Sequence, residues 1–498
     1  MRTFHLQILI RMSLQAPPRL LQLAGQSLLR DEAVAIPAVK ELPRELFPQL
    51  FMEAFTKRQR KVLTAMVQAW PFICLPLGSL MLTPELETLR AVLDGLDVLL
   101  AQKVRPSGWK LQVLDLREVD ENFWSVWSGA PVSSSLAMSQ RQTGEDCPCT
   151  GRQGCLKVVV DFCFGFPDIV LQEFLMHVCE WAQQRKELVH LCCKQLVLSV
   201  RYVNEVRKFL EMMDLNCIQD IEVHTYREMD SLEQFLPYLI QMKNVRKIMF
   251  RHFPGCIYCS PRIGAEIMWE LISTFRKLDK LQKLHLDMVN FFKNHLQQLV
   301  RFLKNPLVSF TITGCWISES QMDRLFLSPS IHQLKELDLT GTILSDFNPE
   351  PFQILLEEVA ATLEVLILED CWITDSQLNV ILPALSRCHQ IISFNFCGNQ
   401  ISKSVLENLL RHTVRLERLN SVIFPVPLEC YGDNFDHIYW ERFVQLRAWL
   451  MEILRETQAL RKPEVILLCT LPCLTCGSRA SYDLEPSPCS CGKLGREP

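Results

Sequence analysis

Two pairs of closely spaced cysteines near the end of the chain have the residue type and spacing of a zinc site. A structural zinc ion takes four soft ligands in a tetrahedron, and two short-spaced thiol pairs joined by a loop can supply them. The four thiols are Cys473, Cys476, Cys489 and Cys491. The sequence leaves two interpretations open, a structural zinc ion at this cluster or a reduced tail without metal.

Other cysteines have neighbours that resemble catalytic or metal-binding groups. The run His190-Leu191-Cys192-Cys193 places a base beside thiols, but it belongs to an apolar strand in which these side chains would pack inward. A buried thiol is inert unless positive groups lower its pKa, so we interpret this run as core. We interpret Cys147, Cys149 and Cys155 as loop thiols without metal.

Signatures of common enzymes are missing from the sequence. There is no G-x-x-x-x-G-K-[ST] phosphate loop, no G-x-G-x-x-G after a strand, no H-E-x-x-H and no G-x-S-x-G. The 18 glycines are few for loops that cradle cofactors. We therefore expect a protein that is not an enzyme and needs no cofactor beyond the zinc considered above.

The composition favours a soluble intracellular chain whose partners are proteins. Of the 498 residues 48% are hydrophobic, while the formal net charge of −4 gives no general attraction to nucleic acid or to anionic membranes. Many of the 21 cysteines occupy interior positions, which indicates a reducing compartment. No apolar stretch reaches the roughly 18 residues of a membrane helix. We expect a cytoplasmic or nuclear protein with neither a membrane nor nucleic acid as direct partner.

A repeated apolar pattern over 281–426 must position any functional surface. Each line follows the leucine-rich-repeat signature L-x-x-L-x-L-x-x-N/C-x-L, and successive lines start about 25 to 29 residues apart. The lines begin at Leu281, Leu307, Leu334, Leu363, Ile391 and Leu416. Capping-box spacings at Ser318-x-x-Gln321 and Thr374-x-x-Gln377 predict helix starts between strands. We predict an α/β leucine-rich-repeat solenoid, a horseshoe with parallel strands on its concave side and a helical N-terminal cap.

The rest of the chain divides into segments around this solenoid. We predict an atypical extension over 1–12, a helical region over 13–105, the solenoid over 106–426 with a loop insertion at 128–154, and a C-terminal cap with a cysteine-rich tail over 427–498. Apolar periodicity predicts helices at 19–35, 49–70, 86–100 and 440–454. The first repeat-like strand is predicted at 111–116, and degenerate strands are predicted at 156–162, 188–191, 218–223 and 245–250.

The strands of the solenoid offer a candidate binding face. Side chains that alternate with the buried leucines point to the concave side. The candidates are Lys283, His285, Asp287, Thr311, Glu336, Asp338, Glu369 and Asn395. Their mixture of charges, hydroxyls and apolar neighbours suits a protein or peptide better than a phosphate backbone. The alternative is a solvated scaffold surface that binds nothing.

Several stretches of the chain resemble the PRAME family of leucine-rich-repeat proteins. The stretches are PPRLLQLAGQSLL at 17–29, LPRELFP at 42–48, MVQAWPF at 66–72, KLQVLDL at 110–116 and LPALSRC at 382–388, followed by the cysteine-rich end. The resemblance runs from about Met12 to about Cys491. It implies a substrate-recognition adaptor of a cullin-2 RING ubiquitin ligase, which binds target proteins for ubiquitination and proteasomal degradation and thereby affects transcription, differentiation, apoptosis and proliferation.

The resemblance also implies partners and binding residues for the ligase arm. The implied partners are elongin B/C, cullin-2 and a RING-box protein, together with an unidentified protein substrate. Three residues spaced four apart on one helical face are similar to the elongin-binding pattern: Leu20, Ala24 and Leu28. Three residues are similar to the cullin-2 box: Leu42, Pro43 and Leu46. The alternative is that all six simply cap the open end of the solenoid.

A second function is implied by the same resemblance, namely transcriptional corepression through L-x-x-L-L helices that bind nuclear receptors without a ligase. Leu96-x-x-Leu99-Leu100 and Leu406-x-x-Leu409-Leu410 match that string. Such strings are common in buried helices, and we expect both to face the core.

Overall fold

The structure is a computed structural model that divides into two compact units. It describes residues 20–80, 86–102, 110–117, 124, 155–164, 169–199, 203–224, 230–252, 261–289, 295–315, 317–432, 438–456, 463–472 and 478–484. The first unit comprises Met1–Phe162, Phe166–Lys194 and Lys208–Cys217. The second comprises Cys163–Gly165, Gln195–Arg207 and Ile218–Pro498. The predicted extension at 1–12, the insertion at 128–154 and all four C-terminal zinc candidates, Cys473, Cys476, Cys489 and Cys491, lie outside the described residues.

The first unit begins with short helices and continues with parallel strands. Its helices are α2 (Leu20–Leu28), α3 (Glu32–Ala38), α4 (Phe47–Thr56), α5 (Arg60–Gln68), α6 (Leu86–Leu100) and α8 (Ile169–Gln184), with 3₁₀ turns at Val39–Glu41, Arg44–Leu46, Gly78–Leu80 and Leu215–Cys217. Strands β1 (Cys74–Pro76), β2 (Val113–Asp115) and β3 (Leu156–Phe164) pair in parallel, β1 with β2 and β2 with β3. The strand predicted at 111–116 is therefore preceded by a strand, β1, that the sequence did not indicate.

Two predicted helices of this unit are each divided in the structure. The helix predicted over 19–35 ends at Leu28, and α3 starts after Asp31, whose side chain caps the new helix by accepting from the Ala33 amide at 2.9 Å. The helix predicted over 49–70 is broken at Arg58, whose φ of 58° lies in the left-handed region. Apolar periodicity runs across both breaks, which is why it did not reveal them.

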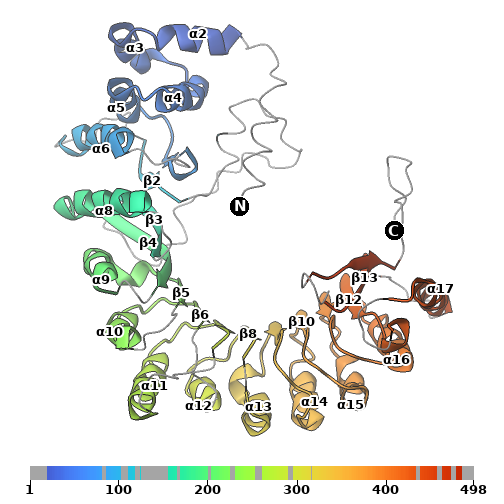
Figure 1. Cartoon of the computed structure of the whole chain (residues 1–498). Coiled ribbons are helices and arrows are strands. Elements are labelled where there is room, and N and C mark those ends of the chain that lie inside the picture. The colour runs from blue at the N-terminus through green and yellow to red at the C-terminus, as the bar shows by residue number, and fades with distance from the viewer. Residues whose placement is uncertain are drawn as a thin grey trace. The chain divides into compact units, whose positions relative to one another are not determined.

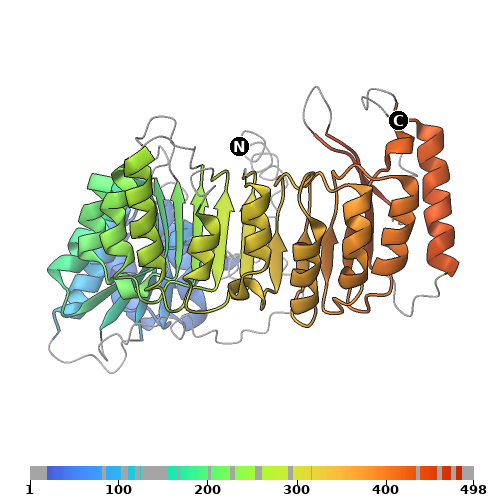
Figure 2. The same ribbon diagram turned by 90° about the horizontal axis from the view of Figure 1, so that it is seen from below.

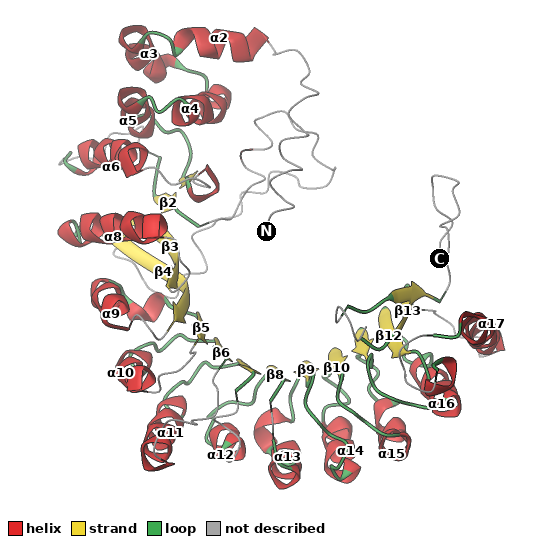
Figure 3. Cartoon of the chain, viewed as in Figure 1, coloured by secondary structure: helices red, strands yellow, loops and turns green. Residues whose placement is uncertain are grey.

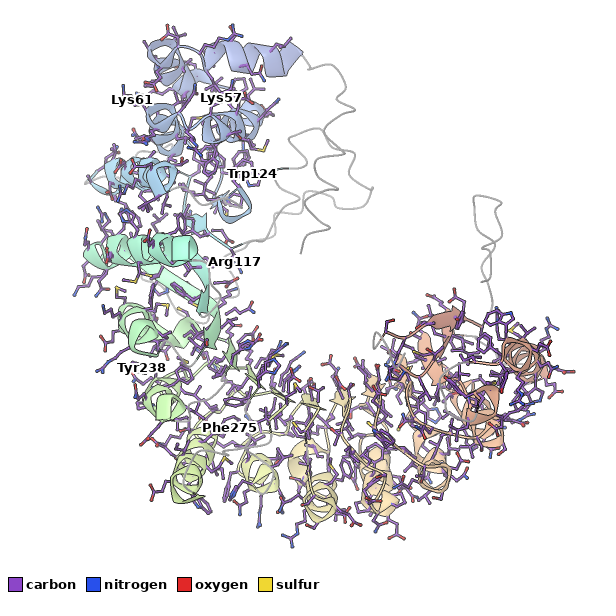
Figure 4. The ribbon with its side chains drawn as sticks, viewed as in Figure 1. Lys57, Lys61, Arg117, Trp124, Tyr238 and Phe275 are labelled. Atoms are coloured by element: carbon purple, nitrogen blue, oxygen red, sulfur yellow. The ribbon has the colours of Figure 1, made fainter. Side chains whose placement is uncertain are left out.

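An aromatic cluster that includes Trp124, labelled in Figure 4, lies in the core of the first unit. The ring of Phe51 lies 5.1 Å from that of Trp70 and 5.8 Å from that of Trp124, and all three side chains are buried. The Trp124 indole nitrogen donates to the Pro76 carbonyl at 2.8 Å, so the polar atom of this buried ring is satisfied. The cluster joins α4 and α5 to the end of β1.

The second unit alternates strands and helices along its length. Its strands are β5 (Asp220–His224), β6 (Lys247–Arg251), β7 (Lys283–Asp287), β8 (Ser309–Thr313), β9 (Glu336–Asp338), β10 (Val365–Ile367), β11 (Ser393–Asn395), β12 (Ser421–Pro425), β13 (Val465–Cys469) and β14 (Ser481–Asp483). Strands β5 to β13 pair in parallel in chain order, and β14 alone pairs antiparallel, with β13. β4 (Val189–Ser199) pairs with β5 through its residues from Gln195 onward.

The helices of the second unit return the chain from each strand to the next. They are α10 (Asp230–Leu239), α11 (Pro261–Phe275), α12 (Leu296–Arg301), α13 (Glu319–Phe326), α14 (Pro349–Glu358), α15 (Asp375–Leu385), α16 (Lys403–Thr413) and α17 (Trp440–Glu456), with 3₁₀ turns at Pro329–Ile331 and Leu428–Cys430; α9 (Val203–Met212) precedes them. Within this unit the strands lie on the inner side of a curve and the helices on its outer side (Figures 1 and 3). Figure 2 shows the helices side by side along the unit. The predicted leucine-rich-repeat fold is confirmed.

The leucines of the repeat lines form the core between strands and helices. Each line-opening residue, from Leu281 to Leu416, is at most 2% exposed. A ladder of polar and thiol side chains continues this core at the strand ends. Its members are Cys315, Thr342, Cys371 and Asn399, and each donates to a main-chain carbonyl of the preceding repeat. We call these four residues the buried ladder.

The capping-box predictions have different outcomes. Thr374 and Gln377 make both reciprocal bonds of the box at the start of α15. Ser318 occupies the N-cap of α13 but makes no side-chain cap bond, so the box predicted with Gln321 was wrong in that respect. The four degenerate strands are present as β3 to β6, although β4 runs on to Ser199, well beyond the predicted 188–191.

Candidate protein-binding face

The inward-facing strand residues of the second unit form rows across neighbouring strands. Parallel register brings Lys283, Ser309 and Glu336 side by side, and likewise His285, Thr311 and Asp338. Because successive side chains of a strand point to opposite sides, these rows alternate with buried leucines. The eight residues predicted for this face are all half-buried: Lys283, His285, Asp287, Thr311, Glu336, Asp338, Glu369 and Asn395. We call the surface formed by these eight residues the concave face. Ser309 shares its first row but is only 1% exposed.

A network of charged groups occupies the β5 to β8 end of the concave face. Glu222 Oε1 lies 2.8 Å from His224 Nε2 and 2.9 Å from Arg251 Nε. Arg251 also lies 4.0 Å from Asp287, which accepts from the Thr313 hydroxyl at 2.8 Å. Glu222, His224 and Arg251 were not among the predicted face residues. Continuing the strand alternation into the degenerate repeats would have identified them.

A second network lies at the β9 to β11 end and is largely acidic. Arg479 Nη1 donates to Glu369 Oε1 at 2.7 Å, and its Nη2 donates to Asp370. Glu369 also accepts from the Asn395 amide at 2.8 Å. Arg479 arrives from the segment just before β14, so it crosses to β10 from far along the chain. No local sequence pattern indicates this contact, because the two acids and the arginine are about 110 residues apart.

The pKa of one predicted residue shows the electrostatic character of the face. The pKa of His285 is lowered to about 4, chiefly by burial and then by the positive charges of Lys247 and Lys283. His285 is therefore neutral at pH 7. The fixed charges that remain are basic around Lys247 and Lys283 and acidic around Glu336, Asp338 and Glu369. An extended peptide with an acidic end and a basic end would complement this distribution.

The predicted elongin-binding residues lie on α2, within the first unit. Ala24 is exposed, as is Leu23 at 47%, and Leu28 is half-buried. The adjacent side of this segment packs inward: Leu29, which follows α2, is 2% exposed, and a Cβ at Gly25 would lie 2.7 Å from Leu50 of α4. Of Leu20 the structure describes only the helical backbone. The face that carries Ala24 is thus uncovered within the first unit.

The predicted cullin-binding residues surround a 3₁₀ turn between α3 and α4. Pro43 is exposed, while Leu42 and Leu46 are half-buried. The guanidinium of Arg44 in this turn lies 4.6 Å from the centre of the Phe72 ring. A cation over an aromatic face fixes the turn against the body of the unit. The turn therefore presents Pro43 outward on a supported segment.

The two L-x-x-L-L strings face the core as expected. Leu96 and Leu99 of α6 are at most 3% exposed, while Leu100 is half-buried. Leu406, Leu409 and Leu410 of α16 are at most 1% exposed. Neither helix can offer these leucines to a receptor groove without leaving its packing. Among the described residues, moreover, no helix combines the length and apolar character required to cross a bilayer.

Comparison with known sequences identifies the family of the chain. A family model described as the PRAME N-terminal domain matches residues 17–124, and one described as the PRAME C-terminal domain matches residues 156–491. The chain belongs to the PRAME family. Human PRAME family member 12 is 54% identical to this chain, and the match covers 96% of this chain and 98% of the relative. Human PRAME family member 8 is 51% identical, and the match covers 96% of this chain and 100% of the relative.

Solved structures similar to this PRAME family chain are more distant. A leucine-rich-repeat-containing protein, LegL7, from Legionella pneumophila has 16% identity and a TM-score of 0.37, covering 65% of this chain and 92% of that one. The yeast complex of Rad7 and Elc1 gives 15% identity and a TM-score of 0.35, covering 50% of this chain and 62% of that one. These scores are low, and the fold assignment rests on the strand–helix alternation of the chain itself.

Proposed function

We propose that this PRAME family chain is the substrate-recognition adaptor of a cullin-2 RING ubiquitin ligase. Its first unit would bind elongin B/C and cullin-2, and its concave face would hold the protein to be ubiquitinated. The RING-box protein would join through the cullin. The chain itself would not be an enzyme.

The observation that carries the elongin assignment is the uncovered face of α2. An amphipathic helix that docks into a partner's groove must leave apolar side chains exposed in the free protein. Leu23 and Ala24 meet this requirement, while Gly25 and Leu29 hold the helix to its own unit. Leu23, at 47% exposure, supplies an apolar side chain that a partner's groove could cover.

The proposed contribution to ubiquitination is proximity. Holding a target beside a charged E2 raises the effective concentration of its lysines without any residue of this chain taking part in the chemistry. The mixed charges of the concave face suit this work, because complementary charges select a partner and orient it. The corepressor alternative draws little support from the L-x-x-L-L strings, since every leucine of the two strings except the half-buried Leu100 is buried.

A pair of matched substitutions tests the elongin arm. Ala24→Asp places a charge on the uncovered face of α2, and Val34→Asp places one on α3 at a residue that is 55% exposed. Ala24→Asp carries a helix-propensity cost of up to about 0.7 kcal/mol, whereas Val34→Asp carries almost none, because valine and aspartate have similar propensities. We expect Ala24→Asp to abolish recovery of elongin C and cullin-2 from cells, and Val34→Asp to leave it intact. Equal recovery with both variants would reject the assignment.

A further variant separates the two parts of the arm. Pro43→Asp alters the exposed residue of the cullin-box-like turn and leaves α2 unchanged. We expect this variant to retain elongin C and to lose cullin-2. Retention of both partners would show that the turn does not contact the cullin.

A further inference from the structure

Three side chains of metal-binding types converge at one end of β4 in the first unit. His190, Asp214 and Cys217 each offer one ligand atom, and these atoms all lie within 4.8 Å of one another. His190 belongs to β4, and the other two belong to the turn that follows α9. No established motif of the sequence joins them, since 190 and 217 are separated by the whole of α9.

The distance between two of the ligand atoms fits a tetrahedral zinc site. Cys217 Sγ lies 3.4 Å from His190 Nε2. Zinc bonds of about 2.0–2.1 Å to nitrogen and about 2.3 Å to sulfur, at the tetrahedral angle, separate these two atoms by about 3.6 Å. The pair is therefore placed for coordination without movement of the backbone.

The turn that carries Asp214 and Cys217 is held by its own hydrogen bonds. Asp214 Oδ1 accepts from the Asn216 amide at 3.0 Å and from its side-chain nitrogen at 3.1 Å. The Cys217 amide donates to the Asp214 carbonyl at 3.0 Å. These bonds orient the carboxylate and leave Oδ2 as the oxygen for a metal. Fixed ligands of this kind are what a metal site requires of its surroundings.

Water would complete the coordination of the metal. Cys192 stands two residues after His190 on the same side of β4, but it is not part of the group whose ligand atoms lie within 4.8 Å of one another. The ligands that the chain itself supplies are therefore His190, Asp214 and Cys217, and three protein ligands with one water form an established zinc coordination.

The local charges balance when a divalent cation is added. The Cys217 thiolate and the Asp214 carboxylate would carry two negative charges, which the two positive charges of Zn²⁺ balance, and His190 would bind as the neutral imidazole. A nucleophilic role for Cys217 fits less well, because this thiol is fully buried and out of reach of a substrate.

A route to the site exists from solvent. His190 and Asp214 line a surface hollow of about 250 Å³, together with Lys186, Met212 and Met213. A metal ion can therefore reach the half-buried imidazole and carboxylate, and the buried Cys217 thiol lies behind them. Access and preformed ligands are both conditions for a metal site.

We propose that the chain binds a zinc ion through His190, Asp214 and Cys217, with water as the fourth ligand. The ion ties β4 to the turn that leads out of α9, and it stabilises a part of the first unit where the repeat pattern is degenerate. This site is distinct from the cysteine cluster at the end of the chain.

Cobalt substitution tests the proposal in the full-length chain. The background variant carries serine at Cys473, Cys476, Cys489 and Cys491, so that the C-terminal thiols cannot contribute. We expect this background to bind one Co²⁺ per chain under reducing conditions, with the thiolate-to-cobalt absorption and visible bands of a tetrahedral site. We expect His190→Ala and Cys217→Ser to weaken Co²⁺ binding by at least about tenfold, and zinc to displace the cobalt.

A matched variant keeps the test informative. Cys193→Ala removes the neighbouring buried thiol, which projects from the opposite side of β4, and should retain the cobalt spectrum. Circular dichroism of each variant without metal separates unfolding from loss of a ligand. Absence of the spectrum in the folded background, or its persistence in folded Cys217→Ser, would overturn the proposal.

Discussion

Polar residues recur along the second unit in two regions, the buried ladder and the concave face, and they are used differently. In the buried ladder, Asn399 donates to the carbonyls of Leu368 and Phe396 and accepts from the Ile373 amide. On the concave face, Lys283 lies 3.7 Å from Glu336, and both side chains remain over 40% exposed. Side chains that form hydrogen bonds with buried main-chain groups hold neighbouring repeats together. Side chains that bond to one another at the surface stay available to a partner.

The largest expected effect comes from the buried ladder at Asn399. Asn399→Ala removes three hydrogen bonds of 2.7 to 3.0 Å and leaves buried main-chain groups unpaired. Each unpaired buried group costs about 1–3 kcal/mol. We expect the free energy of unfolding to fall by about 3 kcal/mol or more, measured by urea denaturation. A loss below about 1 kcal/mol would show that water or a neighbour replaces the amide.

A smaller loss is expected at Thr342, which makes one bond of the same kind. Its hydroxyl donates to the Ile312 carbonyl at 3.1 Å, and the residue is 1% exposed. Thr342→Val keeps the shape and removes the donor, at an expected cost of about 1–2 kcal/mol. Thr311→Val, on the concave face, is the control in the same urea experiment. If the two valine variants lose equal stability, the distinction between ladder and face fails.

The positions of the buried ladder could be predicted from the repeat pattern of the sequence. Contacts between distant segments of the chain could not be predicted in this way. The repeat signature places a small polar or thiol residue eight positions after the opening residue, and in four of the lines this residue is Cys315, Thr342, Cys371 or Asn399. The alternation of side chains between the two sides of a strand likewise predicted the eight residues of the concave face. These features were accessible because both depend on spacing within one repeat.

Features that depend on several repeats or on local breaks were missed. The ion pairs of Arg479 with Glu369 and Asp370 join residues that no periodicity relates. The break before α3 depends on a single capping residue, Asp31, inside a continuous apolar pattern. The meeting of His190 with Cys217 depends on how the chain returns after α9. In each case the decisive contact is tertiary, and the sequence shows only the residue types.

The pH dependence of stability should report the burial of His285 on the concave face. The pKa of His285 is about 4 in the folded chain, whereas an unfolded histidine titrates near about 6.5. Between these values the unfolded chain binds more protons, so stability falls as the pH drops from about 7 to about 4. With solvent screening considered, we expect a contribution of about 1 kcal/mol.

The contribution of His285 is measured by comparing unfolding free energies at pH 7 and pH 5 for two variants. His285→Gln removes the titrating group, and His389→Gln, at an exposed position, is the control. We expect the loss of stability on acidification to be smaller in His285→Gln than in the control. NMR titration of the wild-type imidazole near pH 6.5 would contradict the prediction.

The smallest effect on stability, and the most informative for binding, is expected from reversing an ion pair on the concave face. Lys283→Glu combined with Glu336→Lys exchanges the charges of neighbouring residues in one row. Exposed ion pairs contribute about 0.2–1 kcal/mol, so the reversed pair should change stability by less than about 0.5 kcal/mol.

Selection of peptides from a displayed library measures the effect on binding. Peptides selected against the wild-type chain should carry acidic residues near one end. Peptides selected against the reversed chain should carry basic residues at that end. Identical selections would show that the charges of this row belong to the scaffold and do not choose a partner.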